Sequence, residues 1–164
     1  MKRLHVHLRV DDLARSIEFY TALFGSAPSL VKHDYAKWQV DEPRVNFAVS
    51  KRGGAAGLDH LGIQVDDGAE LTEVAERLSS FGAELVEQKD ARCCYAHSDK
   101  AWARDPQGIS WETFLTHGAA SEDQAAVISA RGPEGDCRNA AAPSGGCCAA
   151  TSCGAPAASE ACCA

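Results

Sequence analysis

Three side chains that can bind a divalent metal occur at related positions in the sequence. His5 and His60 occupy equivalent places in two similar segments, 55 residues apart. Glu112 lies in the alternating segment 109–115, on a partly apolar face. A carboxylate on such a face is costly unless it is paired or bound to a metal. Two histidines and one carboxylate are typical of non-heme Fe(II) oxygenases, although Zn, Mn or Ni accept the same ligands. The sequence therefore predicts a metal centre at these three residues.

The repeat leaves an alternative at the first ligand. His7 lies on the same face of the extended segment as His5 and could be the ligand instead. The register favours His5, because His60 aligns with it whereas Gly62 aligns with His7. His5 could also lie at the surface, and His60 could be a hydrogen-bonded core histidine. The repeat gives no support to the other histidines, His33, His97 and His117.

Cys93 and Cys94 form a second candidate group, because they are adjacent. A disulfide between neighbouring residues closes a small, strained ring. Two thiolates side by side are good ligands for a soft, thiophilic centre. The alternative is a pair of buried structural thiols, since free cysteine often packs as a small apolar residue. The pair is expected in a loop that enters a strand.

The elements that must position these groups form a repeat. The segments 4–12 and 59–67 align, and each leads into residues with helical spacing. The helices are expected from Leu13 to Phe24 and from about Leu71 to Phe81, with caps at Asp11 or Asp12, Asp66 or Asp67, Gly25 and Gly82. Strand-like runs follow at 35–40, 44–50, 84–88, 94–97, 101–104 and 109–115. A glycine-rich linker, 51–57, joins the halves, so the predicted fold class is α+β.

Charge and hydropathy exclude several classes of function. The chain has 164 residues and a net charge of −7, which argues against a nucleic-acid or anionic membrane surface. It lacks an apolar run long enough for a transmembrane helix, and its first residues do not resemble a secretory signal. We therefore expect a cytoplasmic protein. There, its eight cysteines are more typical of metal, metalloid or redox chemistry than of disulfides.

The composition changes near residue 118. Residues 119–164 contain no aromatic residue and, among Leu, Ile and Val, only Val127 and Ile128. Such a segment cannot offset the entropy of ordering itself. We expect a domain at 1–118 and a disordered, flexible Ala/Gly/Cys-rich tail at 119–164. The tail cysteines lack zinc-finger spacing and could capture thiophilic metals or have no role; they are Cys137, Cys147, Cys148, Cys153, Cys162 and Cys163.

The repeat, with a histidine in its first strand, resembles a known superfamily. Together with the run Val-Asp-Asp-Leu-Ala-Arg-Ser-Ile-Glu-Phe-Tyr-Thr-Ala-Leu-Phe-Gly at 10–25, it resembles the vicinal oxygen chelate (glyoxalase/bleomycin-resistance/extradiol dioxygenase) superfamily over roughly 1–116. The resemblance implies paired βαβββ modules, at about 1–52 and 57–116, whose sheets curve around one divalent metal. Such modules often pair between chains, so a homodimer is one arrangement that the resemblance allows.

A narrower resemblance concerns four short motifs. Leu58–Gly62, Cys93–Ala96, Asp99–Trp102 and Trp111–Thr113 are similar to the organoarsenical C–As lyase subfamily, with cadmium-induced proteins as near relatives. This resemblance implies Fe(II)- and O2-dependent cleavage of trivalent methyl- or aryl-arsenicals to arsenite. It makes His5, His60 and Glu112 the metal ligands and catalytic residues, and Cys93 and Cys94 the arsenic-binding pair. Some members carry Gln at the position of His5.

Two other functions stay open at this point. One is a thiol protein that sequesters cadmium or arsenite without turnover. The other is a glyoxalase-like or glutathione-linked enzyme of the same superfamily. Replacement of Cys93 by Ser discriminates between them, because only the lyase needs that thiol for turnover. The expected partners of the lyase are a trivalent organoarsenical and O2, with neither nucleic acid nor membrane.

Overall fold

The chain passes twice through the order strand, helix, three strands. A computed structural model of the protein describes residues 2–119. The first module comprises β1 (Arg3–Arg9), α1 (Leu13–Phe24), β2 (Leu30–Lys32), β3 (Tyr35–Asp41) and β4 (Arg44–Ser50). The second module comprises β5 (Gly57–Val65), α2 (Gly68–Phe81), β6 (Val86–Cys93), β7 (Ala96–Arg104) and β8 (Ser110–Ala119). This order confirms the α+β class and the paired βαβββ modules.

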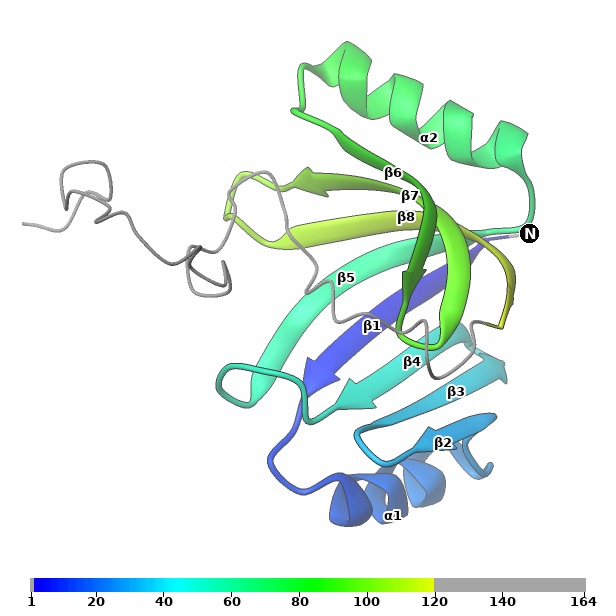
Figure 1. The fold of residues 1–164 in the computed structure, drawn as a ribbon, viewed down its shortest axis with the longest axis vertical. Helices are drawn as coiled ribbons and strands as arrows, with labels where there is room; N and C mark the ends of the chain where they lie inside the picture. The colour runs from blue at the N-terminus through cyan, green and yellow to red at the C-terminus, as the bar shows by residue number, and fades with distance from the viewer. Residues whose placement is uncertain (1, 120–164) are drawn as a thin grey trace, which may run out of the picture.

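Within residues 2–119, all the strands belong to one curled sheet. Its eight strands lie in the order β2-β3-β4-β1-β5-β8-β7-β6. The modules join where β1 pairs with β5 in antiparallel fashion, and β4 and β8 flank this central pair as parallel neighbours. Figure 1 shows the two helices at opposite ends of the molecule, outside the curled sheet. The strands that carry the predicted ligands are therefore the central ones.

The helix boundaries follow the predicted caps. The Asp12 side chain accepts a hydrogen bond of 3.0 Å from the Arg15 amide, and the Asp67 side chain accepts one of 2.8 Å from the Glu70 amide. Each helix ends at a glycine with left-handed backbone, Gly25 or Gly82. These caps fix where each helix begins and ends.

The two faces of β1 have opposite chemistry. Val6 and Leu8 pack with the apolar cluster of the first module, which includes Trp38 and Phe47. His5 and His7 alternate with them and therefore point to the other face of the sheet. In the strand register His7 lies opposite His60, whereas His5 lies opposite Gly62. The face away from the helices is thus the polar one, and it carries the histidines from both modules.

Two strands differ from the sequence prediction. In the expected strand at 94–97, Cys94 and Tyr95 form a turn instead, and only the last two residues join the expected strand at 101–104 in β7. The strand expected at 84–88 is β6, which begins at Val86 and extends to Cys93. Register shifts between Gln88 and Ala91, and between His97 and Ser98, break the two-residue alternation that sequence reasoning relies on. Strand β2 was not expected, because three residues are too few for a pattern.

The predicted tail, 119–164, lies outside the described residues except for Ala119. The predictions for the tail cysteines therefore concern residues that the structure does not describe. Within residues 2–119, neither helix is long and apolar enough to cross a bilayer.

Gly62 allows the closest approach in the centre of the sheet. A Cβ at this position would lie 2.3 Å from the backbone oxygen of Glu112, on the neighbouring strand β8. We expect Gly62→Ala to lower the free energy of unfolding by about 1–3 kcal/mol, because β5 and β8 must separate. Urea denaturation measures the change. Gly118→Ala is the matched control, since no heavy atom lies within 4 Å of its Cβ position. Equal stability of both variants would contradict this reading of the β5–β8 contact.

Candidate metal and thiol site

His5, His60 and Glu112 come together at the junction of the modules. The distance between the two histidine Nε2 atoms is 3.2 Å. Glu112 Oε2 lies 3.4 Å from Nε2 of His60 and 3.8 Å from Nε2 of His5. All three side chains are buried, with relative exposures of 4–5%. The structure thus brings together donor atoms from distant parts of the sequence, since His5 and Glu112 are 107 residues apart.

Hydrogen bonds orient both imidazole rings toward the same point. Nδ1 of His5 donates to the Asn46 carbonyl oxygen at 2.9 Å, and Nδ1 of His60 donates to Asp59 at 2.7 Å. Arg9 in turn donates to the second oxygen of Asp59 at 2.6 Å. A proton on each Nδ1 leaves Nε2 available as a ligand, which is the usual arrangement for metal-binding histidines.

This donor set fits a divalent metal. With bond lengths of about 2.0–2.2 Å, neighbouring ligands of a tetrahedral or octahedral ion lie about 3.0–3.5 Å apart. Two of the three separations fall within that range, and the third, 3.8 Å, is slightly larger. Two neutral imidazoles and one carboxylate are ligands that Fe, Mn, Zn and Ni accept.

His7 is a fourth buried donor beside this group. The donor atoms of His5, His7 and His60 all lie within 4.8 Å of one another. Nε2 of His7 is 2.9 Å from the Ser50 hydroxyl oxygen, and its ring meets the His60 ring edge-on at 4.9 Å between centroids. The sequence leaves His7 open as an alternative to His5, and the structure places both beside His60. A three-histidine set of His5, His7 and His60 is therefore a second possible ligand set.

The charges of the site follow from burial and from close partners. Burial lowers the pKa of His5 to about 4 and that of His7 to about 3, so both are neutral at pH 7. Burial also lowers the pKa of His60, but hydrogen bonds to Asp59 and Glu112 outweigh it and raise the value to about 9. A metal bound at Nε2 of His60 would displace a proton and satisfy Glu112 in its place.

Lys100 connects this group to the thiols. Its ammonium donates to Glu112 Oε1 at 2.5 Å and to Cys93 Sγ at 2.7 Å, and its side chain is buried. Burial opposes the charge of Lys100, but the anionic neighbours outweigh it and raise the pKa of Lys100 above its ordinary value. The same ammonium outweighs burial at Glu112 and holds the pKa of that carboxyl well below its usual range.

The thiols differ in their charge. A hydrogen bond from Cys94 and the charge of Lys100 outweigh burial and lower the pKa of Cys93 to about 6. That same hydrogen bond and burial raise the pKa of Cys94 well above its ordinary value. Cys93 is therefore a thiolate at pH 7 and Cys94 a thiol. Cys93 ends β6, whereas Cys94 lies in the β6–β7 turn rather than in a strand.

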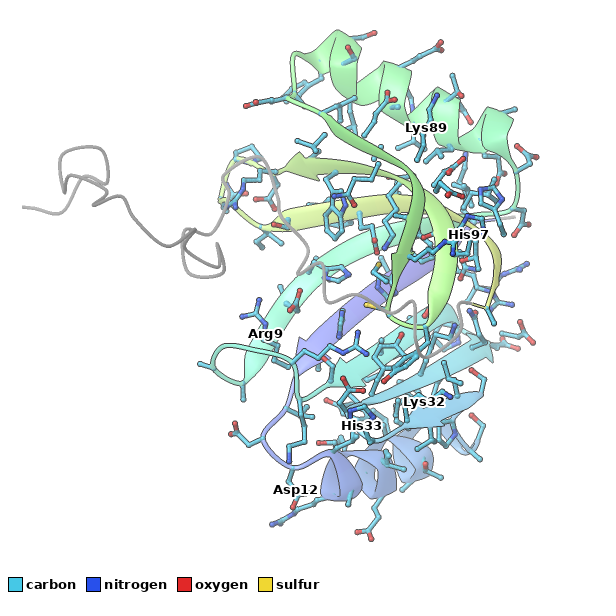
Figure 2. The ribbon with its side chains drawn as sticks, viewed as in Figure 1. Arg9, Asp12, Lys32, His33, Lys89 and His97 are labelled. Atoms are coloured by element: carbon cyan, nitrogen blue, oxygen red, sulfur yellow. The ribbon has the colours of Figure 1, made fainter. Side chains whose placement is uncertain are left out.

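The remaining histidines lie apart from the predicted site. His33 is exposed at the β2–β3 turn, and His97 pairs with Asp90 near the start of β7 (Figure 2). His117 pairs with Asp99 at 3.2 Å. Each of these three histidines thus has a carboxylate beside it, at or near the protein surface.

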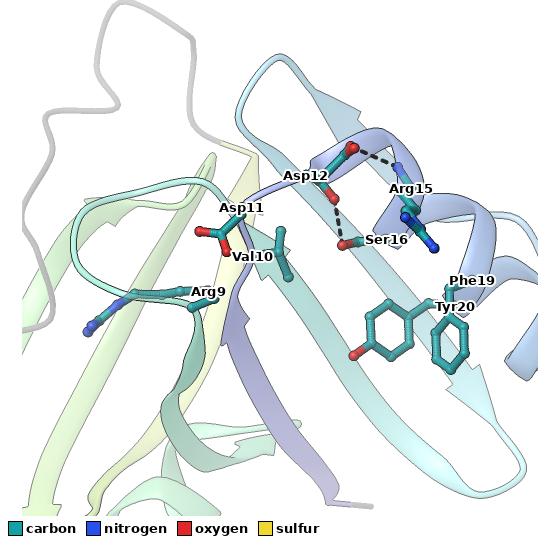
Figure 3. A pocket seen from close by; sticks show the side chains of 9 residues that line it. Arg9, Val10, Asp11, Asp12, Arg15, Ser16, Phe19 and Tyr20 are labelled. Atoms are coloured by element: carbon teal, nitrogen blue, oxygen red, sulfur yellow. Dashed lines mark hydrogen bonds between the residues drawn. The ribbon is translucent and has the colours of Figure 1, made fainter.

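A pocket of about 380 Å³ lies where β1 leads into α1, on the outside of the first module (Figure 3). Of its two carboxylates, Asp12 caps the helix through the Arg15 amide. Of its two guanidinium groups, that of Arg9 donates to Asp59. Within residues 2–119, its lining includes none of the predicted site residues, so we place no chemistry there.

Comparison with known families agrees with the fold. The Glyoxalase/Bleomycin resistance protein/Dioxygenase superfamily matches residues 2–113. The chain belongs to that superfamily. The chain is also similar in structure to homoprotocatechuate 2,3-dioxygenase from Brevibacterium fuscum, with a TM-score of 0.56 and 21% identity. That match covers 74% of this chain but only 34% of the dioxygenase, and it supports the fold alone.

Closer relatives within the superfamily carry names that concern arsenic and cadmium. The trivalent organoarsenical cleaving enzyme of Thermomonospora curvata is 41% identical over 73% of this chain and 81% of the relative. The enzyme of the same name from a Bacillus strain is 41% identical over 75% and 78%. Cadmium-induced protein CadI of Mycobacterium tuberculosis is 32% identical over 70% and 76%. The resemblance predicted from the sequence motifs is confirmed by these matches.

Sequence reasoning missed two supporting residues of the site. Asp59 precedes a predicted ligand, and its hydrogen bond to the adjacent His60 could have been suspected from that position. Lys100 belongs to the motif Asp99–Trp102, but only the pairing of β7 with β8 shows that it contacts Glu112. A lysine in a strand gives no such signal by itself.

Metal titration distinguishes the two possible ligand sets. We expect Glu112→Gln to weaken Co²⁺ binding by about tenfold or more, and His7→Ala to change it by less than about threefold, because Glu112 completes the closer set of donors. Absorption titration of Co²⁺ measures both, with thermal unfolding as the folding check. Glu87→Gln, an exposed carboxylate on β6, is the control. A larger effect of His7→Ala would favour the three-histidine set instead.

The reactivity of Cys93 tests the contact with Lys100. We expect its alkylation by iodoacetamide to increase with pH around a midpoint near 6, because the thiolate is the reactive form. Lys100→Met removes the stabilising charge and should move the midpoint toward that of an ordinary thiol. Peptide-resolved mass spectrometry separates Cys93 from the other cysteines. Lys89→Met, an exposed lysine on β6, is the control; an unchanged midpoint in Lys100→Met would contradict the assignment.

Proposed function

We propose that the protein is an Fe(II)- and O2-dependent C–As lyase that converts trivalent methyl- or aryl-arsenicals to arsenite, and so detoxifies arsenic. The observation that carries this proposal is the direct connection of the thiol pair to the metal-type donor set. Lys100 contacts both Cys93 and Glu112, and Glu112 approaches both histidines. The names of the relatives at 41% identity support the same substrate class.

The thiols supply the capture step. A trivalent arsenic with one organic group carries two exchangeable hydroxyl groups. The Cys93 thiolate displaces one and Cys94 the other, so that two As–S bonds form and hydroxide and water leave, while the C–As bond remains. Before capture, the Lys100 ammonium stabilises the buried Cys93 thiolate, and after capture it remains beside Glu112. The turn that carries Cys94 thus holds the organic group next to the donor set.

His5, His60 and Glu112 would hold the metal, as ligands and catalytic residues. Fe(II) with open positions supplies O2 activation when it is bound. Asn46 and Asp59 fix the two imidazoles, and Lys100 keeps Glu112 ionised. The ring of Trp102 packs against His60 and that of Phe114 against His5, each with 5.1 Å between ring centroids. These aromatic rings exclude water from that side of the donor set.

The compartment and the partners follow from this chemistry. Free thiols at Cys93 and Cys94 require a reducing environment, for which we propose the cytoplasm. The partners are the trivalent organoarsenical and O2. The structure pairs the two modules within one chain, and a homodimer stays a possibility that the resemblance allows.

Sequestration without turnover is the second candidate, and the similarity to the cadmium-induced proteins favours it. A thiol pair with a lowered pKa would also bind Cd²⁺. Sequestration does not require His60 or Glu112, so the two candidates differ in their dependence on the metal-type donors. A glyoxalase-like or glutathione-linked reaction would use those donors but would not need Cys93.

Arsenic speciation decides between these functions. Protein purified without O2 is loaded with Fe(II), exposed to air with trivalent methylarsenical, and analysed by chromatography. We expect inorganic arsenite to form only when both iron and O2 are present. Cys93→Ser and His60→Ala should each lower the rate by more than a hundredfold, because the first loses capture and the second loses a ligand. His33→Ala, an exposed histidine, is the control. Tight binding with unchanged speciation would contradict the lyase and favour sequestration.

A further inference from the structure

The turn that carries the thiols is tied to the other module. Tyr95, which follows Cys94, donates its hydroxyl hydrogen to Asp34 at 2.8 Å. Asp34 lies between β2 and β3 of the first module, 61 residues away along the chain. Arg52, just after β4, donates to both carboxylate oxygens of Asp34, at 2.7 and 3.3 Å. A carboxylate of one module thus holds a tyrosine of the other.

Arg52 also reaches the turn directly. Its guanidinium lies over the Tyr95 ring, 4.9 Å from the centroid, and 5.5 Å from the centroid of Tyr35. One of its nitrogens, Nη1, lies 3.6 Å from Cys94 Sγ, within hydrogen-bond distance of a sulfur. The two thiols therefore have different cations beside them. Cys93 meets Lys100 of its own module, whereas Cys94 meets Arg52 of the first module.

The backbone of the turn needs such support. Cys94 and Tyr95 have φ angles of 53° and 61°, in the left-handed region that side chains other than glycine rarely adopt. Two consecutive residues of this kind are costly, and they persist where the surrounding contacts hold them. The Tyr95 side chain contacts the first module at Asp34, Arg52, Tyr35 and Lys32.

We propose that Asp34 and Arg52 are positioning residues for arsenical binding, and that they act by holding the Cys94–Tyr95 turn so that both thiols face one arsenic atom. This inference rests on the proposed function, since it assumes that the thiol pair captures the substrate. Asp34 acts through Tyr95, and Arg52 acts through Asp34 and through its contact with Cys94. Neither residue is a metal ligand in this scheme, so metal binding does not depend on them.

Binding of phenylarsine oxide to the metal-free protein tests the inference. The parent is the full-length chain with serine at the six cysteine positions after residue 119, so that only Cys93 and Cys94 remain. Calorimetry measures the affinity for the arsenical, and a separate titration measures the affinity for Co²⁺. The variants are Arg52→Gln, Arg52→Lys and Asp34→Asn. Arg77→Gln, which breaks only an exposed pair with Glu73 on α2, is the matched control.

We expect Arg52→Gln and Asp34→Asn to weaken arsenical binding at least tenfold and to leave the Co²⁺ affinity within twofold of the parent. Arg52→Lys should recover only part of the loss, because lysine keeps the charge but not the two-pronged contact with Asp34. Arg77→Gln should bind as the parent does. Arsenical affinities of Arg52→Gln and Asp34→Asn that equal that of the parent would overturn the inference.

Tyr95→Phe keeps the test decisive if the charge variants do not fold. It removes one hydroxyl group and leaves the ring on Arg52, and it should weaken arsenical binding at least threefold. An unchanged affinity in a folded Tyr95→Phe protein would also overturn the inference. Failure of the parent to bind the arsenical would contradict the thiol capture of the proposed function, and the inference with it. A parent that binds, with variants that bind equally well, contradicts the inference alone.

Discussion

The buried contact between Lys100 and Glu112 is the interaction on which the rest of the site depends. Burying either charge alone would cost several kcal/mol, so each needs the other. Glu112 also lies close to both histidines, and Lys100 also donates a hydrogen bond to Cys93. The pair therefore links a hard donor set for a metal to a soft thiolate sulfur, because the Lys100 ammonium contacts both Glu112 and Cys93. Removal of Lys100 leaves the charges of Glu112 and Cys93 without the cation that they share.

The duplicated fold explains how this contact is built. Pairing of β1 with β5 brings equivalent strands of the two modules together, and so His5 and His60 meet. The two modules differ at one position of the site. At the position of His7 in the first module, the second module has Gly62, and β8 closes in on that glycine from the other side. Glu112 can approach the histidines because no side chain stands there.

Much of this architecture is predictable from the sequence, because it depends on local periodicity and on the internal repeat. The helix caps and both helices follow from patterns within each half. The convergence of His5 with His60 follows from the alignment of the two halves. Lys100, Asp34 and Arg52 could not be assigned in this way, since their partners lie on other strands or in the other module. The β6–β7 region was the least predictable, because two register shifts hide its alternation. The alternative between His5 and His7 at the first ligand stayed open, because both lie on one face of the same strand and only side-chain geometry separates them.

The central claim is that the thiol pair and the metal donors form one site for an organoarsenical. Anomalous diffraction from a crystal that contains Co²⁺ and phenylarsine oxide, recorded at the cobalt and arsenic edges, tests it most directly. We expect a cobalt peak among His5, His60 and Glu112, and an arsenic peak between Cys93 and Cys94 with its phenyl group toward the cobalt. An arsenic peak bound elsewhere, or a cobalt peak held by His7 without Glu112, would contradict the claim.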